Sequence, residues 1–572
     1  MTNSEIVDTF ERIANLLEIK GEIIYKILAY RHAAESIRLQ TSDLATMSEK
    51  DILAIPGVGQ AIAEKIQELL TTGKLDFLQK LEKEVPPGLI ELLNVQDLGP
   101  KKAAIFWKQA GITNMELLES AAQTGKLRTL PGMGEKSEAR ILTGIKALKE
   151  VKKRLPIAKA LVIADEWLGK LRQIKELHKV EAAGSLRRWK TSIGDLDFVG
   201  ASDQPKEVMQ KFVSLPGIER ILSQGENKTS VQVSDGLNVQ LWLQPSERFG
   251  SLLQFVTGSK EHNVKLREFS LKQGLSLSER GFISNNLKET VCPEEEIVYH
   301  TLGLPWIAPE LREDRGELQA ALNHSLPDLI SIEDIQSDLH THSDWSDGRS
   351  SIEAMIQIAI HRGLKVLAIT DHSQRTLNVR GLDFRLLNEQ RKEIQKLQGK
   401  YGNSITLLQG IEMEILESGQ LDLPDEILAE LDIVVASLHD HLEQPRQTIT
   451  DRLLKVIRNQ NVDIIAHPSG RELPQSDGAD LDWEKVYQAA RENQVALEIN
   501  CNPVHLDLDE IHARAAVEKG VLLTIDTDSH SAHQLDNMKF GVAVARRGWV
   551  NKNSVINSWS SQKLLDWLKN RK

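Results

Sequence analysis

Short apolar segments alternate with stretches of helical spacing from about Gln336 onward. The apolar segments include "VLAITDH", "ITLLQGIEMEI", "DIVVASLHDH", "VDIIAHP", "VALEIN" and "VLLTIDTDSH". Strands that alternate with helices along a chain pair in parallel. All strands of a parallel barrel end at the same edge, where polar residues at the strand ends meet. The pattern predicts a (β/α) barrel over residues 336–572 with a functional site at its carboxyl edge.

Histidines and acidic residues stand at nearly every one of these strand ends. Imidazoles combined with carboxylates suit Zn²⁺, Mn²⁺ or Fe better than Mg²⁺. A lone histidine at a strand end is usually a satisfied polar group, but nine residues in one register predict a cluster of up to three ions. Glu412 is the predicted bridging carboxylate. The predicted ligands are His340, His342, Asp347, His372, Glu412, His439, His467, Asp528 and His530.

The same segment is similar to the polymerase and histidinol phosphatase (PHP) domain. The similarity covers about residues 336–572 and rests on motifs such as "SDLHTHSDWSDG", "TDHS" and "IAHPSGR". It implies a barrel of the PHP type with 3′–5′ exonuclease or related phosphoesterase activity. The expected cofactor is Mn²⁺ or Zn²⁺, with up to three ions in the site.

A short element recurs in the helical first 150 residues. "IPGVGQAIAEKI" and "LPGMGEKSEARI" match each other, and "VQDLGPKKAAIF" matches more weakly, with Asp97 in place of the first glycine. The element resembles the helix-hairpin-helix motif, whose exposed backbone N–H groups hold a DNA phosphate without reading a base. A plain helical corner with glycine caps is the alternative interpretation. The predicted DNA-binding glycines are Gly57, Gly59, Gly99, Gly132 and Gly134.

Two aspartates, Asp195 and Asp197, are separated by one residue in the apolar stretch "DLDFV". Side chains two residues apart on a strand point to the same face, so the two carboxylates would lie side by side and raise each other's pKa. Hard oxygen ligands of this kind suit Mg²⁺ or Mn²⁺. A structural ion pair is the alternative interpretation.

The residues upstream of this pair favour a catalytic role. The run "AGSLRRWKTSIGDLDFV" resembles the palm signature of the nucleotidyltransferases. With the helix-hairpin-helix elements before it and "TGSKEHN" after it, the segment 1–315 resembles a family X DNA polymerase, the group that contains DNA polymerase beta. The resemblance implies that Asp195 and Asp197 are catalytic and hold Mg²⁺ or Mn²⁺. It implies nucleotide-binding roles for Ser185, Arg188, Asn263 and Arg267.

The third palm carboxylate of that family is missing here. The family carries it on a neighbouring strand, which in this chain is "NVQLWLQP" with Gln240 at the matching position. A neutral amide in place of a carboxylate should lower metal occupancy and rate together. Asp235, in the turn "SDGLN", is a poorly placed substitute. The prediction is a retained polymerase fold with weak or absent synthesis; a fully active gap-filling polymerase is the alternative.

The N-terminal helices resemble the deoxyribose-phosphate lyase domain of the same family. Lys65 matches the lysine that forms the Schiff base, and Lys26 and Tyr30 match its supporting pair. A second lysine usual in the hairpin loop is Ala61 here. Such a lysine must stay partly unprotonated to act as a nucleophile. Solvated helix lysines near a phosphate are an equally good interpretation.

A chain of 572 residues is too long for one core and is expected to fold as several domains. The net charge is −12, of which residues 331–572 carry −10, so the acidic balance belongs mostly to the metal-binding segment. Two cysteines, no long apolar run and a polar start predict a cytoplasmic, non-membrane protein. The expected order is a lyase-like helical domain 1–90, a fingers-like region 91–155, an α+β palm 156–245, a thumb 246–315, a linker 316–335 and the PHP barrel 336–572.

Together these features predict a monomeric DNA repair enzyme. Its expected partner is gapped or 3′-ended duplex DNA, bound without sequence preference, with deoxynucleoside triphosphates as a second ligand. A DNA-end binding scaffold without catalysis is one alternative, opposed by the complete ligand set. A small-molecule phosphatase is another, opposed by the helix-hairpin-helix elements.

Overall fold

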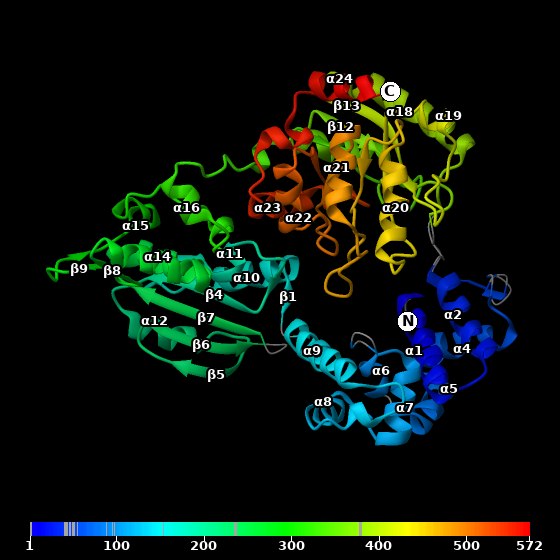
Figure 1. Ribbon diagram of the computed structural model, residues 1–572, viewed down its shortest axis with the longest axis horizontal. Helices are drawn as coiled ribbons and strands as arrows, with labels where there is room; N and C mark the ends of the chain where they lie inside the picture. Colours follow the sequence, from blue (N-terminus) through cyan, green and yellow to red (C-terminus); the bar gives the residue numbers. More distant parts are fainter. Residues whose placement is uncertain are drawn as a thin grey trace. The chain divides into compact units, whose positions relative to one another are not determined.

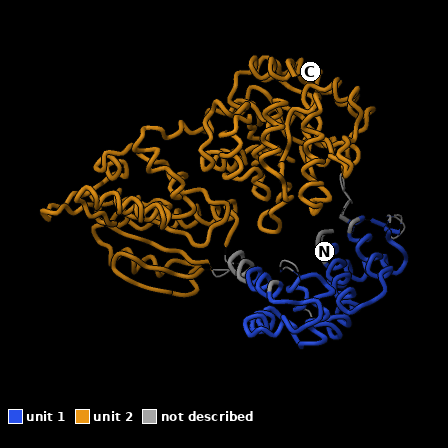
Figure 2. The backbone as a smooth tube through the Cα atoms, viewed as in Figure 1, with its two compact units in different colours: residues 1–152 blue, residues 153–572 orange. Residues whose placement is uncertain are grey.

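The structure is a computed structural model that describes residues 3–38, 44, 47–48, 52–53, 55, 57–86, 88–93, 95, 98–152, 154–233, 237–376 and 380–571. The chain divides into two compact units, residues 1–152 and residues 153–572 (Figure 2). None of the helices within the described ranges combines the length and the hydropathy of a membrane span.

The first unit is helical (Figure 1). Its core consists of apolar side chains spaced three and four apart, among them Phe10, Ile13, Ile66 and Phe106. Glycines with positive φ end α4 and α7, at Gly73 and Gly111 respectively. The helices are α1 (Asn3–Lys20), α2 (Ile24–Arg38), α4 (Gln60–Thr72), α5 (Asp76–Glu84), α6 (Gly88–Leu92), α7 (Pro100–Ala110), α8 (Met115–Gln123) and α9 (Glu135–Lys152).

The palm in the second unit is a five-stranded sheet of order β2-β4-β7-β6-β5, in which β4 and β7 run parallel. The strands are β2 (Lys179–Ala182), β4 (Asp195–Ala201), β5 (Ile218–Gln224), β6 (Lys228–Val233) and β7 (Asn238–Gln244). The strand β5 is mostly exposed and was not among the strands predicted from the sequence.

The alternation of side chains along β4 gives the palm sheet two different faces. Leu196 and Phe198 enter the core with α10 (Ile157–Leu171) and α12 (Pro205–Phe212). Val199, on the other face, packs with Phe249 of α13 (Phe249–Thr257). Asp195 and Asp197 share this second face with Val199 because they lie four and two residues from it, respectively.

The thumb follows the palm and has its own apolar core around Phe282 and Tyr299. Its elements are α13, α14 (Lys260–Lys272), a small antiparallel sheet of order β10-β9-β8, α15 (Glu295–Thr301) and α16 (Glu317–Leu322). The strands of the small sheet are β8 (Leu275–Ser278), β9 (Gly281–Ser284) and β10 (Glu289–Thr290).

The C-terminal part contains seven parallel strands in sequential order, with helices between them. The strands are β11 (Ser337–Asp338), β12 (Val366–Ile369), β13 (Thr406–Glu414), β14 (Ile433–Ser437), β15 (Ile464–Ile465), β16 (Ala496–Asn500) and β17 (Leu523–Asp526). The loops after the first and last strands join through a parallel bridge between Thr341 and Ser529, which nearly closes the barrel. The helices are α17 (Ile352–His361), α18 (Phe384–Tyr401), α19 (Asp425–Leu428), α20 (Arg446–Ile457), α21 (Trp483–Asn493), α22 (Glu510–Glu518), α23 (Met538–Arg547) and α24 (Ser561–Arg571).

Apolar side chains fill the inside of the barrel, and α24 packs against them. Leu564 and Leu568 of this helix share a core with strand residues such as Val366 and Val435. The Arg571 side chain is 3.1 Å from Asp463, just before β15. Since α24 covers the end where the strands begin, the opposite end is left for the functional residues.

Buried ion pairs connect the palm and thumb of the second unit. The carboxylate of Glu295 accepts two hydrogen bonds from Arg187, at 2.7 and 3.0 Å, and a third from the fully buried Arg312. The indole of Trp306 donates a fourth at 3.1 Å. Burial alone would raise the pKa of Glu295, but Arg312 and Arg187 lower it to about 2.

We expect Glu295→Ala to destabilise the second unit strongly. Removing one partner of a buried ion pair leaves its guanidinium partners uncompensated and costs about 3–5 kcal/mol. Nine of the ten tryptophans lie beyond residue 152, so tryptophan fluorescence during urea unfolding of the full chain reports on this unit. The matched control is Glu296→Ala, an exposed position on the same helix, which should shift stability by less than about 0.5 kcal/mol. Equal midpoints for the two variants would contradict the expectation.

Candidate functional site

Strand ends of the barrel carry the nine predicted ligands to one place. His340 and His342 follow β11, and Asp347 lies in the loop after them. Glu412 lies near the end of β13, and the remaining five ligands stand in the segments after β12, β14, β15 and β17. The strand β16 contributes none of the nine. The register of parallel strands therefore brings together side chains that are up to 190 residues apart in the sequence.

Glu412 lies in the middle of the group. Its Oε2 is 2.8 Å from His372 Nδ1, and its Oε1 is 3.1 Å from His467 Nε2. His340, His342 and His439 each place Nε2 at 3.4 or 3.5 Å from the same carboxylate. A carboxylate with imidazoles around both oxygens has the position expected of a bridging ligand.

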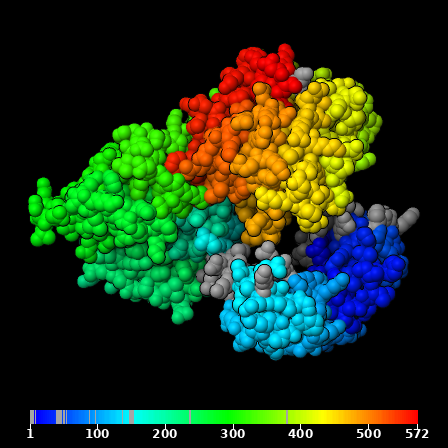
Figure 3. All heavy atoms as spheres, viewed as in Figure 1, coloured from blue at the N-terminus to red at the C-terminus, as the bar shows by residue number. Residues whose placement is uncertain are grey.

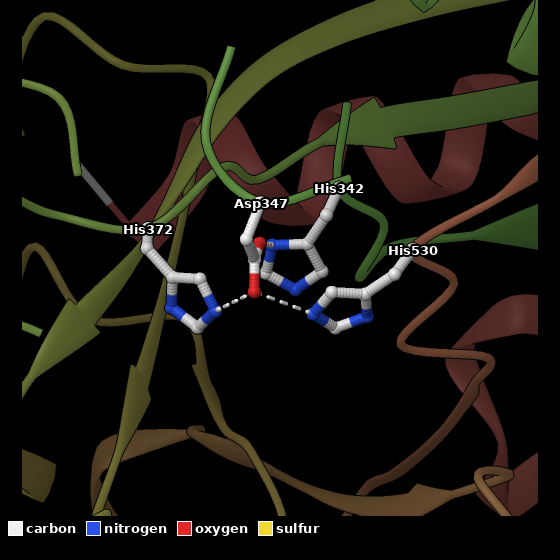
Figure 4. Close-up of side chains that lie close together, drawn as sticks. All are labelled: His342, Asp347, His372 and His530. Atoms are coloured by element: carbon white, nitrogen blue, oxygen red, sulfur yellow. Dashed lines mark ion pairs between the residues drawn. The ribbon is translucent and has the colours of Figure 1, made fainter. Parts of the chain in front are cut away.

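Two aspartates complete the cluster. Asp347 points its carboxylate between the rings of His372, His530 and His342 (Figure 4), and Oδ2 is 3.2 Å from His530 Nε2. Asp528 Oδ1 is 3.0 Å from His342 Nε2. Three sets of donor atoms lie close enough to share a metal ion: His342, Asp347, His372 and His530; His340, His342 and Glu412; and His372, Glu412 and His439.

Hydrogen bonding within the cluster is incomplete in a way that fits bound cations. His342 Nδ1 is buried and has no hydrogen-bond partner within the described residues, and His372 Nδ1 and Glu412 Oε2 lie 2.8 Å apart without the geometry of a hydrogen bond. His340 Nε2 and His342 Nε2 face each other at 3.2 Å. Buried polar atoms are normally paired, so atoms that converge without pairing indicate a missing partner. The imidazole and carboxylate donors present suit Mn²⁺, Zn²⁺ or Fe.

The electrostatics of the cluster couple metal binding to proton release. Burial would raise the pKa of Glu412, but His372 and His340 hold it well below its usual range. Burial and the neighbouring His530 and His372 lower the pKa of His342 to about 3, so this ring is neutral and can bind a metal. Burial opposes the protonation of His340, yet Glu498 and Glu412 raise its pKa. A cation bound at Nε2 would take the place of that proton.

Two carboxylates outside the predicted set hold ligand histidines. Glu498, on β16, is fully buried, and its Oε1 is 2.7 Å from His340 Nδ1. Its Oε2 accepts the backbone N–H of His467 at 2.7 Å and the amide of Asn500 at 3.1 Å. Glu414 lies 2.7 Å from His439 Nδ1. A carboxylate on Nδ1 fixes the tautomer and leaves Nε2 as the metal ligand.

A cavity of about 470 Å³ opens over the cluster. Seven of the nine predicted ligands line it: Asp347, His372, Glu412, His439, His467, Asp528 and His530. The other lining residues are Arg349, Asn502, His505, Ser531 and Gln534, none of which the sequence pattern identified. The ring of His505 stacks on that of His467. In the sequence, only the position of His505 soon after a barrel strand could have indicated a place near the site.

The palm site has a different composition. Gln240 of β7 lies directly opposite Asp197 of β4 in the parallel register. Its amide donates to Asp195 Oδ2 at 2.6 Å, and the indole of Trp242 lies 3.4 Å from Asp197 Oδ1. Burial, followed by the charge of Asp195, raises the pKa of Asp197 to about 7. Asp235 lies outside the described residues.

The predicted nucleotide-binding residues are held by internal contacts. Ser185 and Arg188 lie on and just after α11 (Gly184–Arg187), and Arg188 donates to Glu313 at 3.0 Å and to the Thr257 carbonyl at 2.8 Å. The Asn263 amide donates to the carbonyls of Phe255 and Gly258. Arg267 is exposed and donates to the Asn263 carbonyl.

In the first unit the hairpin glycines stand where helices begin. Gly59 and Gly99 precede α4 and α7 with no side-chain cap, and Gly134 precedes α9. A Cβ added at Gly59, Gly99 or Gly134 would meet no heavy atom within 4 Å, so the space before each helix is open. Gly57 and Gly132 have φ values of +78° and +73°, which glycine adopts without strain. Asp97 lies outside the described residues.

The predicted lyase residues surround one phenylalanine. Lys65 Nζ and Lys26 Nζ lie 5.4 and 5.8 Å from the centre of the Phe77 ring, and Tyr30 stacks on that ring. Lys65 also donates to the Ala61 carbonyl at 3.0 Å. The ammonium groups of two lysines therefore lie near one aromatic ring.

Comparison with known families supports these assignments of fold. Residues 1–75 match the model described as "Helix-hairpin-helix domain" and residues 89–147 match "SAM-like Helix-hairpin-helix tandem". Residues 252–313 match "DNA polymerase beta thumb" and residues 338–502 match "PHP domain".

One relative covers the whole chain. It is the DNA polymerase/3′-5′ exonuclease PolX of Bacillus subtilis (strain 168), which is 38% identical over 572 residues, 100% of each chain. The chain belongs to the bacterial family X DNA polymerases with a C-terminal PHP domain. The predictions of this family, of the multidomain fold and of an enzyme are therefore confirmed.

Other relatives of this family X polymerase match less than half of the chain. A probable phosphatase of Thermoanaerobacter sp. (strain X514) is 30% identical over 250 residues, 41% of this chain and 95% of that protein. A probable phosphatase of Vibrio campbellii (strain ATCC BAA-1116) is 27% identical over 250 residues, which are 42% of this chain and 94% of that protein.

We expect Glu498→Gln to weaken metal binding without unfolding the barrel. The remaining oxygen can still accept the His467 N–H, but the new NH₂ group would donate to His340 Nδ1 and move the ring proton to Nε2. Loss of such an outer contact typically lowers metal affinity about 10–100-fold. Equilibrium dialysis against Mn²⁺ measures the affinity, and Glu492→Ala, at an exposed position on α21, is the control. Unchanged affinity in Glu498→Gln would exclude this role.

Proposed function

We propose that the barrel is a metal-dependent phosphodiesterase that removes nucleotides from the 3′ end of DNA. The observation that carries the proposal is a cluster of nine imidazole and carboxylate side chains, with unpaired buried atoms among them, seven of which line one cavity. The full-length relative from Bacillus subtilis is named as a 3′-5′ exonuclease, and the same activity is proposed here. The nine residues act as ligands for Mn²⁺ or Zn²⁺, with up to three ions.

The chemistry divides between the ions and the chain. Divalent cations, when bound, activate water and polarise phosphoryl oxygens. The chain holds the donor atoms in place: Glu498 and Glu414 orient His340 and His439 through their Nδ1 atoms. Water adds to phosphorus, the bond from phosphorus to O3′ breaks, and the departing oxygen takes a proton. The products are a nucleoside 5′-monophosphate and a strand with a new 3′-hydroxyl.

The rest of the chain delivers DNA to this centre. The open helix starts after Gly59, Gly99 and Gly134 present backbone N–H groups that hold phosphates irrespective of sequence. The helix-hairpin-helix and thumb families that match the chain support DNA as the partner. We propose that the protein binds gapped or 3′-ended duplexes as a monomer. Lyase chemistry at Lys65 is proposed as a further activity of the first unit.

Synthesis in the palm is proposed to be weak. Asp195, Asp197, Ser185, Arg188, Asn263 and Arg267 form the site for a deoxynucleoside triphosphate and Mg²⁺ or Mn²⁺. The amide of Gln240 donates to Asp195 at the place where a third carboxylate would bind the catalytic metal ion. The metal ion must therefore displace this hydrogen bond, and it gains no attraction from a third negative charge. A fully active polymerase is the alternative to this proposal.

A second candidate is a phosphatase that acts on small phosphomonoesters. The observation that favours it is the match of the barrel to proteins named as probable phosphatases. The helix-hairpin-helix elements favour DNA, because a small substrate makes no use of them. A catalytically silent scaffold is a third candidate, and the complete set of nine side chains speaks against it.

We expect the full chain with Mn²⁺ to shorten a labelled 3′-ended duplex, and chelation with EDTA to stop the reaction. His340→Ala and Asp528→Ala each remove a central donor atom and should lower the rate by about 100-fold or more, equivalent to about 2.7 kcal/mol. His361→Ala, at an exposed position on α17, is the matched control and should keep full activity. Hydrolysis of p-nitrophenyl phosphate without DNA shortening would favour the phosphatase, and neither reaction would favour the scaffold.

We expect Gln240→Asp to increase single-nucleotide insertion on a gapped duplex. The new carboxylate stands opposite Asp197 and supplies the missing charge for the catalytic ion, and each 1.4 kcal/mol gained is about tenfold in rate. The insertion assay uses a His340→Ala background so that degradation does not mask synthesis. Asp197→Ala in the same background should abolish insertion. Robust insertion with Gln240, unchanged by Gln240→Asp, would place the third carboxylate elsewhere.

A further inference from the structure

The cavity over the barrel cluster has a second wall that contains no predicted ligand. Arg349, Asn502 and Gln534 belong to this wall, together with His505 and Ser531. Arg349 follows the Asp347 loop, Asn502 follows β16, and Gln534 lies in the 3₁₀ segment Ala532–Asn537 after β17. Residues from three separate loops therefore face the same space as the metal-binding side chains.

Hydrogen bonds within the chain leave the side-chain amides of Gln534 and Asn502 with free donors. The Gln534 Oε1 accepts the backbone N–H of His530 at 2.7 Å, and the Asn502 Oδ1 accepts the backbone N–H of Val504 at 3.2 Å. A backbone N–H can only donate, so each amide must turn its oxygen toward the chain and keep its NH₂ group for another partner. In both residues the amide nitrogen makes no hydrogen bond within the described part of the chain.

Arg349 adds a charge to these neutral donors. Its backbone N–H donates to the His530 carbonyl at 2.7 Å, which fixes the loop next to Gln534. The side chain is exposed to the cavity, and no ion pair among the described residues includes its guanidinium. Most arginines of the barrel are paired, as Arg391 is with Glu430 and Arg471 with Asp509.

His505 does not belong to the donor set. Its Nδ1 lies 2.8 Å from the Arg471 carbonyl, which can only accept, so the neutral ring has no N–H left at Nε2. Arg471 in turn donates to the His505 carbonyl at 2.8 Å, and this reciprocal pair holds the 502–506 loop at the rim of the cavity.

We propose that Arg349, Asn502 and Gln534 form a binding site for the phosphoryl group of the substrate. Guanidinium and amide N–H groups match the unliganded oxygens of a phosphate, with the arginine able to bind two of them. The rest of the lining includes Asp347, Glu412 and Asp528, which repel an anion unless divalent cations cover them. An anion is therefore held between the donor wall and the ions, and its binding requires both.

This inference rests on the proposed function of the barrel, but its test does not depend on catalysis. The probe is inorganic phosphate, titrated calorimetrically into the full chain with and without Mn²⁺. Phosphate should bind with Mn²⁺ and lose most of its affinity without it. Arg349→Ala should weaken binding about 10–100-fold, as expected for a lost hydrogen bond to a charged group. The Mn²⁺ content of this variant, measured by atomic emission, should remain that of the wild type.

Two further variants sharpen the test. Gln534→Glu keeps the shape of the side chain but replaces the NH₂ donor with an anionic oxygen, so it should weaken phosphate binding about as much as Arg349→Ala. Arg385→Ala removes an exposed arginine of α18 and should change nothing. Phosphate affinity that is equal in wild type and Arg349→Ala, or equal with and without Mn²⁺, would overturn the proposal.

Substrate kinetics then identify the source of the phosphoryl group. If Arg349→Ala raises KM for both a 3′-ended oligonucleotide and p-nitrophenyl phosphate, the wall binds the group that is hydrolysed. A rise in KM for the oligonucleotide alone would show that the wall binds a neighbouring phosphate of the strand. If the wild type binds phosphate through Arg349 but leaves DNA intact, the site stands and the proposed exonuclease fails. Failure of the phosphate-binding site and failure of the proposed exonuclease activity are thus distinguishable.

Discussion

The parallel register of the barrel strands is the constraint on which the catalytic centre depends. It places the ends of six strands next to one another and so gathers around Glu412 five imidazoles that are distant in the sequence. Such a group is stable only if its charges are balanced. Neighbouring imidazoles hold the pKa of Glu412 low against burial, and carboxylates raise that of His340. Divalent cations would satisfy both kinds of group at once, because they replace protons and attract the carboxylates.

The backbone at two of the predicted ligands adopts an unusual conformation. His467 and Asp528 have φ values of +25° and +50°, which side-chain-bearing residues seldom adopt. Hydrogen bonds hold both: Glu498 accepts the N–H of His467, and the N–H of Asp528 donates to the His340 carbonyl. Backbone strain of this kind persists where the surroundings determine the conformation, and it is common at functional sites. Glu498 therefore orients one ligand through its ring and a second through its backbone.

Local patterns predicted the strands and the residues at their ends, because strand period and strand-end position are properties of short segments. Gln240 was assigned through the resemblance to family X polymerases, and the strand register places it opposite Asp197. Contacts between loops could not be predicted. Glu498 meets His340 across 158 residues, and a lone glutamate in "VALEIN" looks like any other strand residue. Arg349 and Gln534 are equally inconspicuous, because their role depends on which of their atoms neighbouring loops already bind.

The palm and the barrel of the second unit are joined by a chain of alternating charges. Arg188 donates to Glu313, and Arg547 of α23 donates to Glu313 and to the Arg188 carbonyl. Glu510 of α22 accepts from Arg547. Figure 3 shows the orange surface of the barrel meeting the green surface of the same unit. Arg547 is almost fully buried, so each charge depends on its neighbours for compensation. Arg188, the residue matched to triphosphate binding, is thus also part of the interface with the barrel. Without Arg188, Glu313 and Arg547 would lose a partner in a buried network, so Arg188 has a structural role that does not depend on synthesis in the palm.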